Sequence, residues 1–484
     1  MPDAAIPPGE GSQLDDLIIG PEAIHPGESG LRLIKQGPEA FAIRARSALL
    51  AGRSLDVQTY IWHADLTGMY LAHRLLEAAD RGVRVRMLVD DMDARAKNAG
   101  FAGLDAHPNI RVQMFNPFST RKGLVRQFAE MAVNFDRLNH RMHNKTWIAD
   151  NRIAVVGGRN LGDEYFGASE EVNFVDLDFA MVGPLVRDAS ASFDKYWNAE
   201  TTRSMHALDP ERVNKQELER VRDLLAANAV EGEKSRYAEE NRRDDAVQRL
   251  IAGDWPMEWT AVSRFVVDDP AKVTMEKEAL ERSHVRTLLV PAVQTARKSV
   301  TLISPYFVPN EEGTRLLVDA ARSGRRVRVL TNSLIANDVA AVHGGYSRWR
   351  RELLAGGVEL WELKPQLGGE VHASLLGSRG ASLHTKALAV DGDRLFVGSF
   401  NIDPRSTWLN CEQGILAESA DLARQLEEIF DSQSMGEHAW RVTLADGRLR
   451  WSDGQESFDR DPKADAWRRF QAWITRALGL DAQL

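Results

Sequence analysis

One group of residues occurs twice in this chain, and the second copy follows the first at a distance of 241 residues. Each copy has a histidine, a lysine two positions later and an aspartate five positions after the lysine, followed by a Gly-x-x-Asn segment. Upstream, the segments that begin at Gly82 and Gly324 also match, with an offset of 242 residues. A duplication with this period predicts two domain-sized halves rather than a solenoid of short repeats. The motif residues are His143, Lys145, Asp150, His384, Lys386 and Asp391.

The order of the expected elements repeats as well. A β-rich alternating run at 54–62 is followed by a helical pattern at 69–79 and by a strand at 83–89. The same order returns at 299–308, 313–321 and 327–332. We therefore predict an α/β fold with two halves related by a pseudo-twofold axis, each a mixed sheet flanked by helices.

The chain has 484 residues, which is too long for one ordinary hydrophobic core and therefore predicts several domains. A loose arm is expected at the N-terminus, where Pro and Gly are frequent, and a charged helical linker is expected between the halves. The expected parts are an N-terminal arm at 1–30, a first half at 31–205, a linker at 206–284, a second half at 285–435 and a C-terminal extension with an amphipathic segment at 436–484.

Composition excludes several classes of protein. Apolar residues make up 43% and charged residues 27% of the chain, a balance that excludes general disorder. A single cysteine, Cys411, excludes a disulfide scaffold. The sequence contains no stretch of 18 or more apolar residues, so we expect no transmembrane helix. We also expect no secretory signal. The net charge of −9 argues against a uniformly basic surface for nucleic acid, so no nucleic-acid partner is expected.

The motif spacing suits a phosphate site. On a strand, residues two apart share one face, so each histidine lies beside its lysine. Asp150-Asn151 and Asp391-Gly392 are turn pairs, and a hairpin there returns the Gly-x-x-Asn segment to that face. Small residues let a phosphate approach the backbone, and the lysine and the asparagine amide supply a cation and donors. The expected phosphate-binding residues are Gly158, Asn160, Ser399 and Asn401.

Each half supplies one histidine, and therefore only half of a site. Two halves around a twofold axis would place two histidines on opposite sides of one phosphorus, which gives a nucleophile and a proton donor in one shared active site. This chemistry needs no metal or cofactor, and no metal-ligand motif occurs in the sequence. Each ring also needs a group that orients it. Asp176 in the first half and Glu412 in the second are the candidates, with Asp178 as a rival to Asp176.

The two motif copies form the double HxKxxxxD pattern of the phospholipase D superfamily, which the chain resembles. Within that superfamily, the chain is similar to the bacterial cardiolipin synthases of the C type from about Gly30 to its C-terminus. The segments that carry this second resemblance are 139–145, 157–166, 331–339 and 398–406.

The resemblance implies a phosphatidyl transfer that makes cardiolipin through a covalent phosphohistidine. It favours His143 as nucleophile and His384 as acid and base, and it assigns the lysines and asparagines to phosphate binding. Asp150 and Asp391 belong to the catalytic motif, but we expect them to act structurally at their turns. Two alternatives stay open: a phospholipase D-type lipid hydrolase and, less favoured by the charge, a nucleic-acid phosphodiesterase.

The implied partners are phospholipids: phosphatidylglycerol, with phosphatidylethanolamine as a further candidate donor. The common bacterial cardiolipin synthases carry N-terminal transmembrane helices, and this chain has no such segment, so we expect peripheral contact at the cytoplasmic face of the bacterial inner membrane. The amphipathic segment 466–478 is one candidate for that contact, because Trp467, Phe470, Ile474 and Leu478 share a helical face that Trp473 flanks. The alternative for this segment is an amphipathic helix docked on the core. The basic and apolar run 121–141 is the other candidate for membrane contact.

Overall fold

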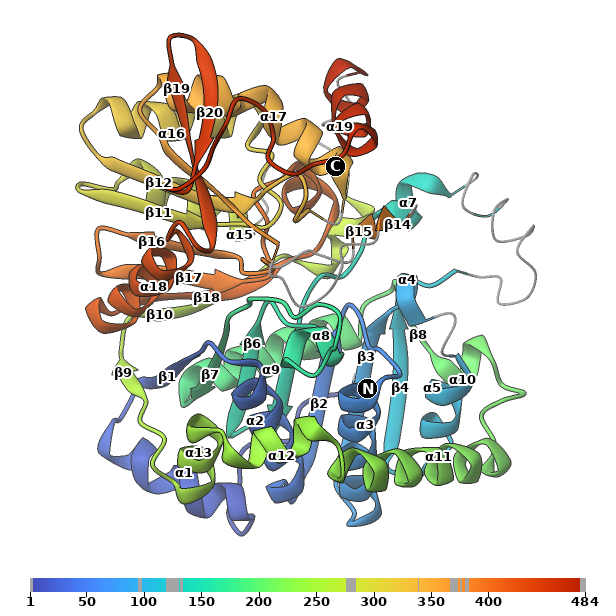
Figure 1. The fold of residues 1–484 in the computed structure, drawn as a ribbon. Coiled ribbons are helices and arrows are strands. Elements are labelled where there is room, and N and C mark those ends of the chain that lie inside the picture. The colour runs from blue at the N-terminus through green and yellow to red at the C-terminus, as the bar shows by residue number, and fades with distance from the viewer. Residues whose placement is uncertain are drawn as a thin grey trace. The chain divides into compact units, whose positions relative to one another are not determined.

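The computed structural model describes residues 3–94, 98–118, 130, 134–275, 284–337, 339–365, 373–374, 377–378 and 383–478. The chain divides into two compact units, and most of the strands of each unit belong to one large sheet (Figure 1). The first unit comprises Met1–Ala168, Asp178–Glu281 and Leu409–Ile415, and the second comprises Ser169–Leu177, Arg282–Trp408 and Leu416–Leu484. A short segment of each half of the sequence thus belongs to the other half's unit.

The sheet of the first unit is mixed. Its strands run in the order β8-β4-β3-β2-β5-β6-β7-β1-β9. Strands β2, β3 and β4 are parallel neighbours, and β5 is antiparallel to β2. The strand bounds are β1 Ser29–Ile34, β2 Ser54–Thr59, β3 Arg84–Asp90, β4 Ile110–Phe115, β5 Thr146–Ala149, β6 Ile153–Gly157, β7 Asp178–Val182, β8 Thr202–Ser204 and β9 Glu258–Thr260.

The sheet of the second unit repeats this pairing. β11, β12 and β13 are parallel neighbours, β16 is antiparallel to β11, and β16 and β17 form a hairpin. β18 lies beside β17, and β19, β20 and β21 extend the sheet beyond β13. The expected duplication and the mixed sheets are therefore confirmed in the topology. The bounds are β11 Ser299–Ile303, β12 Arg326–Asn332, β13 Glu359–Leu363, β16 Ala387–Val390, β17 Arg394–Gly398, β18 Gln413–Glu418, β19 Ala439–Ala445, β20 Arg448–Ser452 and β21 Ser457–Phe458.

Equivalent helices follow the first strand of each repeat. α3 (Leu66–Asp80) is capped by Asp65, whose side chain accepts the Gly68 N–H, and buries Leu71 and Leu75 four residues apart. α16 (Asn310–Arg322) buries Leu317 in the same way. The strand–helix–strand units predicted from sequence are thus present in both units.

The N-terminal arm is not loose throughout. Residues 13–24 form α1 (Gln13–Ile24), which begins at a capping box between Ser12 and Asp15. The buried Asp15 carboxylate also accepts from Arg53 and Arg152 at 2.5 and 2.8 Å. These long-range ion pairs fix the helix, and local composition gives no sign of them, so the expectation of a loose arm is wrong here.

The charged stretch between the halves is helical, but it is not a simple linker. Its longest helix, α11 (Lys215–Glu233), packs against α3 and against α5 (Asn98–Asp105). Leu218, Val221 and Leu225 follow one another at helical spacing and join the core of the first unit. The charged residues cover the outer face of the helix, which is why composition alone made the segment resemble a linker.

Candidate functional site

The first motif histidine is held by a carboxylate from the far end of the sequence. His143 donates its backbone N–H to the Cys411 carbonyl at 2.9 Å, and Met142 forms a parallel bridge with Cys411. This pairing places Glu412 beside the ring, where its Oε2 atom lies 2.9 Å from Nδ1 of His143. The Glu412 side chain is fully buried. The contact with Glu412 fixes the orientation of the His143 ring and occupies Nδ1, which leaves Nε2 as the nitrogen on the far side of the ring from the carboxylate.

The segment that carries Glu412 is itself anchored in the first unit. Glu412 donates its backbone N–H to Asp268 at 3.0 Å, and Asp268 also forms a buried ion pair of 2.8 Å with Lys272. Burial raises the pKa of the neighbouring Cys411 thiol to about 12, so the thiol stays protonated and does not compete as a nucleophile at neutral pH.

Lys145 lies beside His143 in the first half-site. Its Nζ atom donates to the His143 carbonyl at 2.7 Å and sits 5.3 Å from the centre of the Tyr60 ring. The Tyr60 ring also meets the His143 ring edge to face at 5.2 Å. Tyr60 thus contacts both motif residues, and the sequence interpretation missed it because these partners lie far from it in sequence.

The second half-site has the same construction. His384 donates its backbone N–H to the Val175 carbonyl at 2.9 Å, and Leu383 forms a parallel bridge with Val175. Asp176, fully buried, places Oδ2 at 2.5 Å from Nδ1 of His384. Phe174 lies against the ring at 5.3 Å. All of these residues belong to the second unit.

The structure pairs each carboxylate with the histidine of the other motif copy. The sequence interpretation expected Asp176 to serve the first half and Glu412 the second. Both residues do contact a motif histidine, but Asp176 contacts His384 and Glu412 contacts His143. The reason is that the segments 169–177 and 409–415 each fold with the unit formed mainly by the other half of the sequence.

The rival Asp178 has a different role. Its carboxylate forms buried ion pairs with Arg44 at 3.0 Å and with Arg159 at 3.4 Å, and it accepts the Arg159 backbone N–H. These contacts tie β7 to α2 (Gly37–Leu50) and to the loop after β6. Asp178 therefore stabilises the loop that carries Gly158 and Asn160.

The two asparagines differ in their hydrogen bonds. Asn160 is buried, accepts the Ile61 N–H at 3.3 Å and donates to the Tyr165 hydroxyl at 2.9 Å. Asn401 is 4% exposed, and its side-chain oxygen has no partner among the described residues. A buried amide oxygen with no protein partner suits a donor group of a ligand, such as a hydroxyl, because an oxygen cannot donate to a phosphate oxygen. Gly158 and Ser399 are both buried at the equivalent positions after β6 and β17.

Lys386 repeats the placement of Lys145, because its Nζ atom donates to the His384 carbonyl at 2.5 Å. Each half-site therefore combines one ring held by a carboxylate with one nearly buried ammonium group. A positive charge beside a histidine of fixed orientation suits a substrate with a phosphodiester anion.

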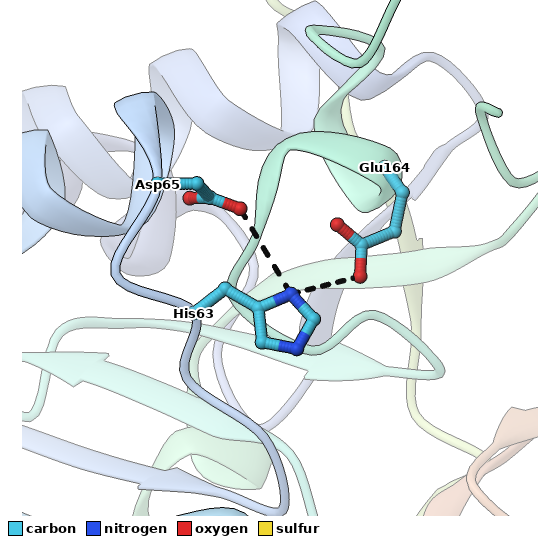
Figure 2. Close-up of side chains that lie close together, drawn as sticks. All are labelled: His63, Asp65 and Glu164. Atoms are coloured by element: carbon cyan, nitrogen blue, oxygen red, sulfur yellow. Dashed lines mark ion pairs between the residues drawn. The ribbon is translucent and has the colours of Figure 1, made fainter. Parts of the chain in front are cut away.

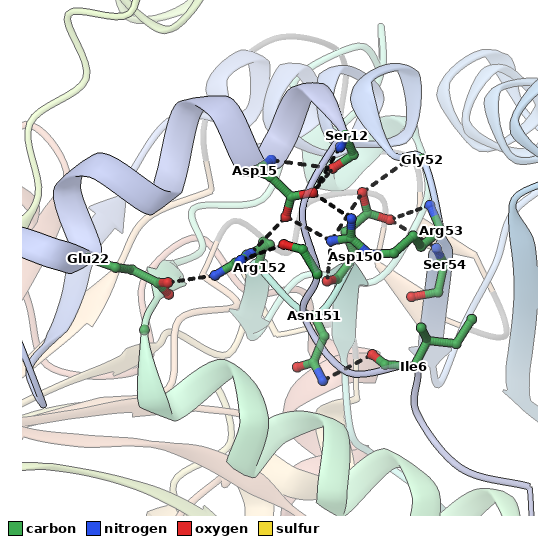
Figure 3. A network of polar contacts seen from close by, with 12 residues as sticks. Ile6, Ser12, Asp15, Glu22, Gly52, Arg53, Ser54, Asp150, Asn151 and Arg152 are labelled. Carbon is green, nitrogen blue, oxygen red and sulfur yellow. Dashed lines mark hydrogen bonds and ion pairs between the residues drawn. The ribbon is translucent and has the colours of Figure 1, made fainter.

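The two motif aspartates lie at hairpin turns. Asp150 has a φ of 52° and accepts the backbone N–H groups of Gly52, Arg53 and Ser54 at 2.9, 2.7 and 2.9 Å (Figure 3). Asp391 has a φ of 58° and accepts the equivalent three N–H groups at positions 297–299, where β11 begins. The contacts hold each hairpin against the strand that starts its repeat.

A further cluster, His63, Asp65 and Glu164, lies beside the loop that carries Asn160, because His63 donates its backbone N–H to the Leu161 carbonyl at 2.7 Å (Figure 2). The His63 ring contacts Glu164 at 3.0 Å and Asp65 at 3.9 Å. Burial, and then the nearby carboxylates of Asp163 and Glu164, raise the pKa of Asp65 to about 6. Among the described residues, the two clusters with the geometry of metal ligands are this one and His343, Glu362 and Asp461, and neither contains a motif residue.

The C-terminal segment forms α19 (Ala466–Leu478), which packs against α17 (Ala340–Ala355). Arg468 faces the unit and donates to the carbonyls of Leu334 and Asn337. The opposite side carries three aromatic residues that contact one another and are 54, 47 and 61% exposed: Trp467, Phe470 and Trp473.

Within the described part of the chain, no helix is both long and apolar enough to cross a membrane. Most of the other candidate for membrane contact, residues 121–129 and 131–133, lies outside the described residues.

The comparisons with known proteins agree with one another. The family described as "Cardiolipin synthase, PLD-like domain" matches residues 48–197 and 289–434, and both ranges contain a motif copy. Cardiolipin synthase C of Escherichia coli K12 is 40% identical over 466 residues, which cover 94% of this chain and 96% of that protein. A cardiolipin synthase of Oceanobacillus iheyensis is 24% identical over 85% of this chain and 70% of its own.

A solved structure adds evidence for the fold. The crystal structure of a phosphatidylserine synthase from Haemophilus influenzae Rd KW20 aligns with a TM-score of 0.61 and 11% identity. The alignment covers 94% of this chain and 95% of that one. At this identity the likeness shows a common fold and carries no conclusion about the substrate.

Proposed function

The chain belongs to the cardiolipin synthase family with phospholipase D-like domains, and we propose that it is a phosphatidyltransferase that makes cardiolipin from phosphatidylglycerol and a donor phospholipid. The observation that carries the proposal is the pair of histidines whose Nδ1 atoms are held by buried carboxylates, at 2.9 Å in one half-site and 2.5 Å in the other. In-line displacement at phosphorus needs two such groups, one on each side of a single phosphate.

In the first step, Nε2 of His143 attacks the phosphorus of the donor lipid. The bond between phosphorus and the head-group oxygen breaks, and His384, protonated, donates its proton to the departing alcohol. The product is a phosphatidyl group bound covalently to His143. Glu412 stabilises the positive charge that develops on the His143 ring, because its carboxylate lies against Nδ1.

In the second step, a glycerol hydroxyl of phosphatidylglycerol attacks the same phosphorus. His384, now neutral, accepts the hydroxyl proton while the bond between phosphorus and His143 breaks. Cardiolipin leaves, and both histidines return to their starting states. Lys145, Lys386 and Asn401 offer the cations and the amide that stabilise the phosphoryl oxygens through both steps.

Each histidine needs a fixed orientation for these roles. Glu412 and Asp176 are fully buried acceptors, and each lies on a segment that pairs with the backbone of the histidine it serves. The assignment of His143 as nucleophile follows the resemblance to the phospholipase D superfamily. The equivalent geometry of the two half-sites is compatible with either order.

We also infer that the protein binds the membrane surface through α19. The exposed stripe of Trp467, Phe470 and Trp473 has the composition of an interfacial helix, and the exposed Arg476 in the last turn adds a positive charge for anionic head groups. Such contact would bring lipids to the half-sites at the cytoplasmic face of a bacterial inner membrane.

The test supplies the purified protein with a donor phospholipid, with and without phosphatidylglycerol, and measures cardiolipin and phosphatidic acid separately. Cardiolipin should rise with the phosphatidylglycerol concentration, and the His384→Ala variant should make neither product. Phosphatidic acid as the main product at saturating phosphatidylglycerol would make the chain a lipid hydrolase. Cleavage of nucleic acid with no lipid consumed would overturn the proposal.

A further inference from the structure

The cluster of His63, Asp65 and Glu164 in the first unit has the geometry of a metal site. The Nδ1 atom of His63 lies 3.0 Å from Oε1 of Glu164 and 3.9 Å from Oδ2 of Asp65, and both carboxylates point toward this one nitrogen (Figure 2). In a tetrahedral zinc site with bonds of about 2.1 Å, neighbouring ligand atoms are about 3.4 Å apart. The observed distances lie on either side of that value, so small shifts of the side chains would bring all three onto one ion.

The backbone holds together the two segments that carry these side chains. Leu161 donates its N–H to the Ile61 carbonyl at 3.2 Å, and its own carbonyl accepts the His63 N–H at 2.7 Å. The Oδ2 atom of Asp65 accepts the Asp163 backbone N–H at 2.8 Å, and a carboxylate oxygen that accepts one hydrogen bond keeps a lone pair for a metal. Because these bonds already fix both segments, an ion would find its ligands in place, at a small cost in ordering the chain.

Gly162 leaves room for an ion among the three ligand atoms. Its φ of 174° is extended backbone, so the main-chain conformation does not require a glycine here. A Cβ atom at this position would instead lie 2.9 Å from Nδ1 of His63, 3.1 Å from Oε2 of Glu164 and 3.2 Å from Oδ2 of Asp65. The three side chains therefore surround one point beside the Gly162 backbone, and a side chain on residue 162 would fill it.

The charges and the ligand types favour a zinc ion. Burial, and then the negative charges of Asp163 and Glu164, raise the pKa of Asp65, and a divalent cation would offset the repulsion among these carboxylates. An imidazole nitrogen with two carboxylates suits Zn²⁺, whereas Mg²⁺ and Ca²⁺ prefer oxygen ligands alone. The three ligand side chains are between 20 and 34% exposed, so a water molecule can reach the fourth position of a tetrahedral ion.

We propose that His63, Asp65 and Glu164 bind a Zn²⁺ ion beside Gly162. His63 coordinates through Nδ1 as the neutral ring, with its proton on Nε2. The ion joins the segment that follows β2 to the loop that follows β6, and it thereby stabilises the loop that carries Asn160. It supplies no group to the reaction, so the site adds to the proposed function and does not depend on it.

Zinc binding to the full chain tests the proposal, after metal has been removed with a chelator. The unmodified protein, Glu164→Gln and Gly162→Ala are titrated with Zn²⁺, and bound zinc is counted by elemental analysis. Glu164→Gln removes a charged ligand, and Gly162→Ala places a methyl group at the point that the ligands surround. Each variant should bind one zinc ion fewer than the unmodified protein, because affinity at this site should fall by about 100-fold or more.

The matched control is Glu28→Gln. His25 and Glu28 form an ion pair that is also 3.0 Å long, has similar exposure and belongs to the same unit, but it is not part of a three-ligand cluster among the described residues. This control should bind as much zinc as the unmodified protein. Equal zinc stoichiometry in all four proteins would overturn the proposal, as would tighter binding of Mg²⁺ than of Zn²⁺ at the site.

Stability gives a second readout. Zn²⁺ at about 100 times its dissociation constant should raise the melting temperature of the unmodified protein by about 5 °C or more, and it should slow hydrogen exchange at residues 160–164. Glu164→Gln and Gly162→Ala should lose both effects, and Glu28→Gln should keep them. Zinc effects that persist in Glu164→Gln and Gly162→Ala would contradict the site. The two variants change it independently, so if one fails to fold, the other decides.

Discussion

The Oε2 atom of Glu412 lies 2.9 Å from the Nδ1 atom of His143, although 269 residues separate the two in sequence. Asp176 and His384 repeat this relationship across 208 residues. In each case, the residue before the carboxylate forms a backbone bridge with the residue before the histidine. Each half-site therefore requires residues from both halves of the sequence, and neither half is a self-sufficient catalytic module.

Glu412→Gln and Asp176→Asn should each lower kcat by about 100-fold or more while the protein stays folded. The amide retains the shape of the side chain but cannot balance the charge that develops on the ring. The limb of the pH–rate profile that reports the affected histidine should move to lower pH, because loss of the neighbouring negative charge disfavours the protonated ring. Steady-state kinetics between about pH 5 and pH 9 check both expectations.

Two controls separate positioning from general damage. Asp421→Asn changes an exposed carboxylate on α18 (Ala420–Gln433) and should leave kcat and the profile unchanged. Glu412→Asp keeps the charge and should recover part of the activity lost in Glu412→Gln. A kcat that stays within twofold in both amide variants would remove the carboxylates from the mechanism.

The fold and the placement of the motif residues could be predicted from the repeated motif, because strand periodicity and turn pairs depend only on residues that are close in sequence. His143 and Lys145 share a face for that reason, and Asp150 lies at its turn. The pairing of Glu412 with His143 was not predictable, because it depends on which segment crosses to which unit. Tyr60 and the ion pairs of Asp15 were missed for the same reason: their partners are distant in sequence, and a single sequence carries no signal of such contacts.

Asp391 should contribute to stability in a pH-dependent way. Burial alone would raise the pKa of its carboxyl group, but the N–H groups of Arg297, Lys298 and Ser299 and the nearby Arg394 lower it below the usual 3.8. A lowered pKa means that the stabilisation is fully present above about pH 4 and is lost as the pH falls through the folded-state value. Asp391→Asn should cost about 1–3 kcal/mol in the free energy of unfolding at pH 7, and the difference from the unmodified protein should shrink in acid.

Urea unfolding at several pH values measures this effect. The exposed Asp393→Asn, in the same turn, is the control and should change the free energy of unfolding by less than about 0.5 kcal/mol. A difference between Asp391→Asn and the unmodified protein that stays constant down to pH 2 would mean that the carboxylate charge is not what holds the turn.

The aromatic face of α19 should bind lipid. Replacing Trp467, Phe470 and Trp473 together by serine should weaken binding to anionic liposomes by about tenfold or more, because each large apolar side chain contributes buried area at the interface. The melting temperature should change little, since these side chains are about half exposed. Leu224→Ser changes a similarly exposed apolar residue on α11 and should leave binding intact. Undiminished liposome binding by the triple variant would exclude α19 as the membrane contact.

Activity should survive dialysis against a chelator, because in the proposed mechanism two histidines provide the acid and the base, two lysines provide the cationic groups and Asn401 provides an amide. Removing one residue of the His63, Asp65 and Glu164 cluster by His63→Ala should not create a requirement for a divalent ion. Cardiolipin formation measured before and after chelation checks this. Complete loss that one divalent ion restores would contradict the two-histidine mechanism.

The most direct test of the account is to trap the covalent intermediate. The protein is mixed with a donor phospholipid labelled in its phosphatidyl group, quenched in alkaline denaturant, and digested for mass spectrometry. A phosphatidyl group on His143 is predicted in the unmodified protein, and it should disappear in His143→Ala and on addition of phosphatidylglycerol as cardiolipin forms. Cardiolipin formation with no modified histidine at any quenching time, or with full activity retained in His143→Ala, would contradict the account.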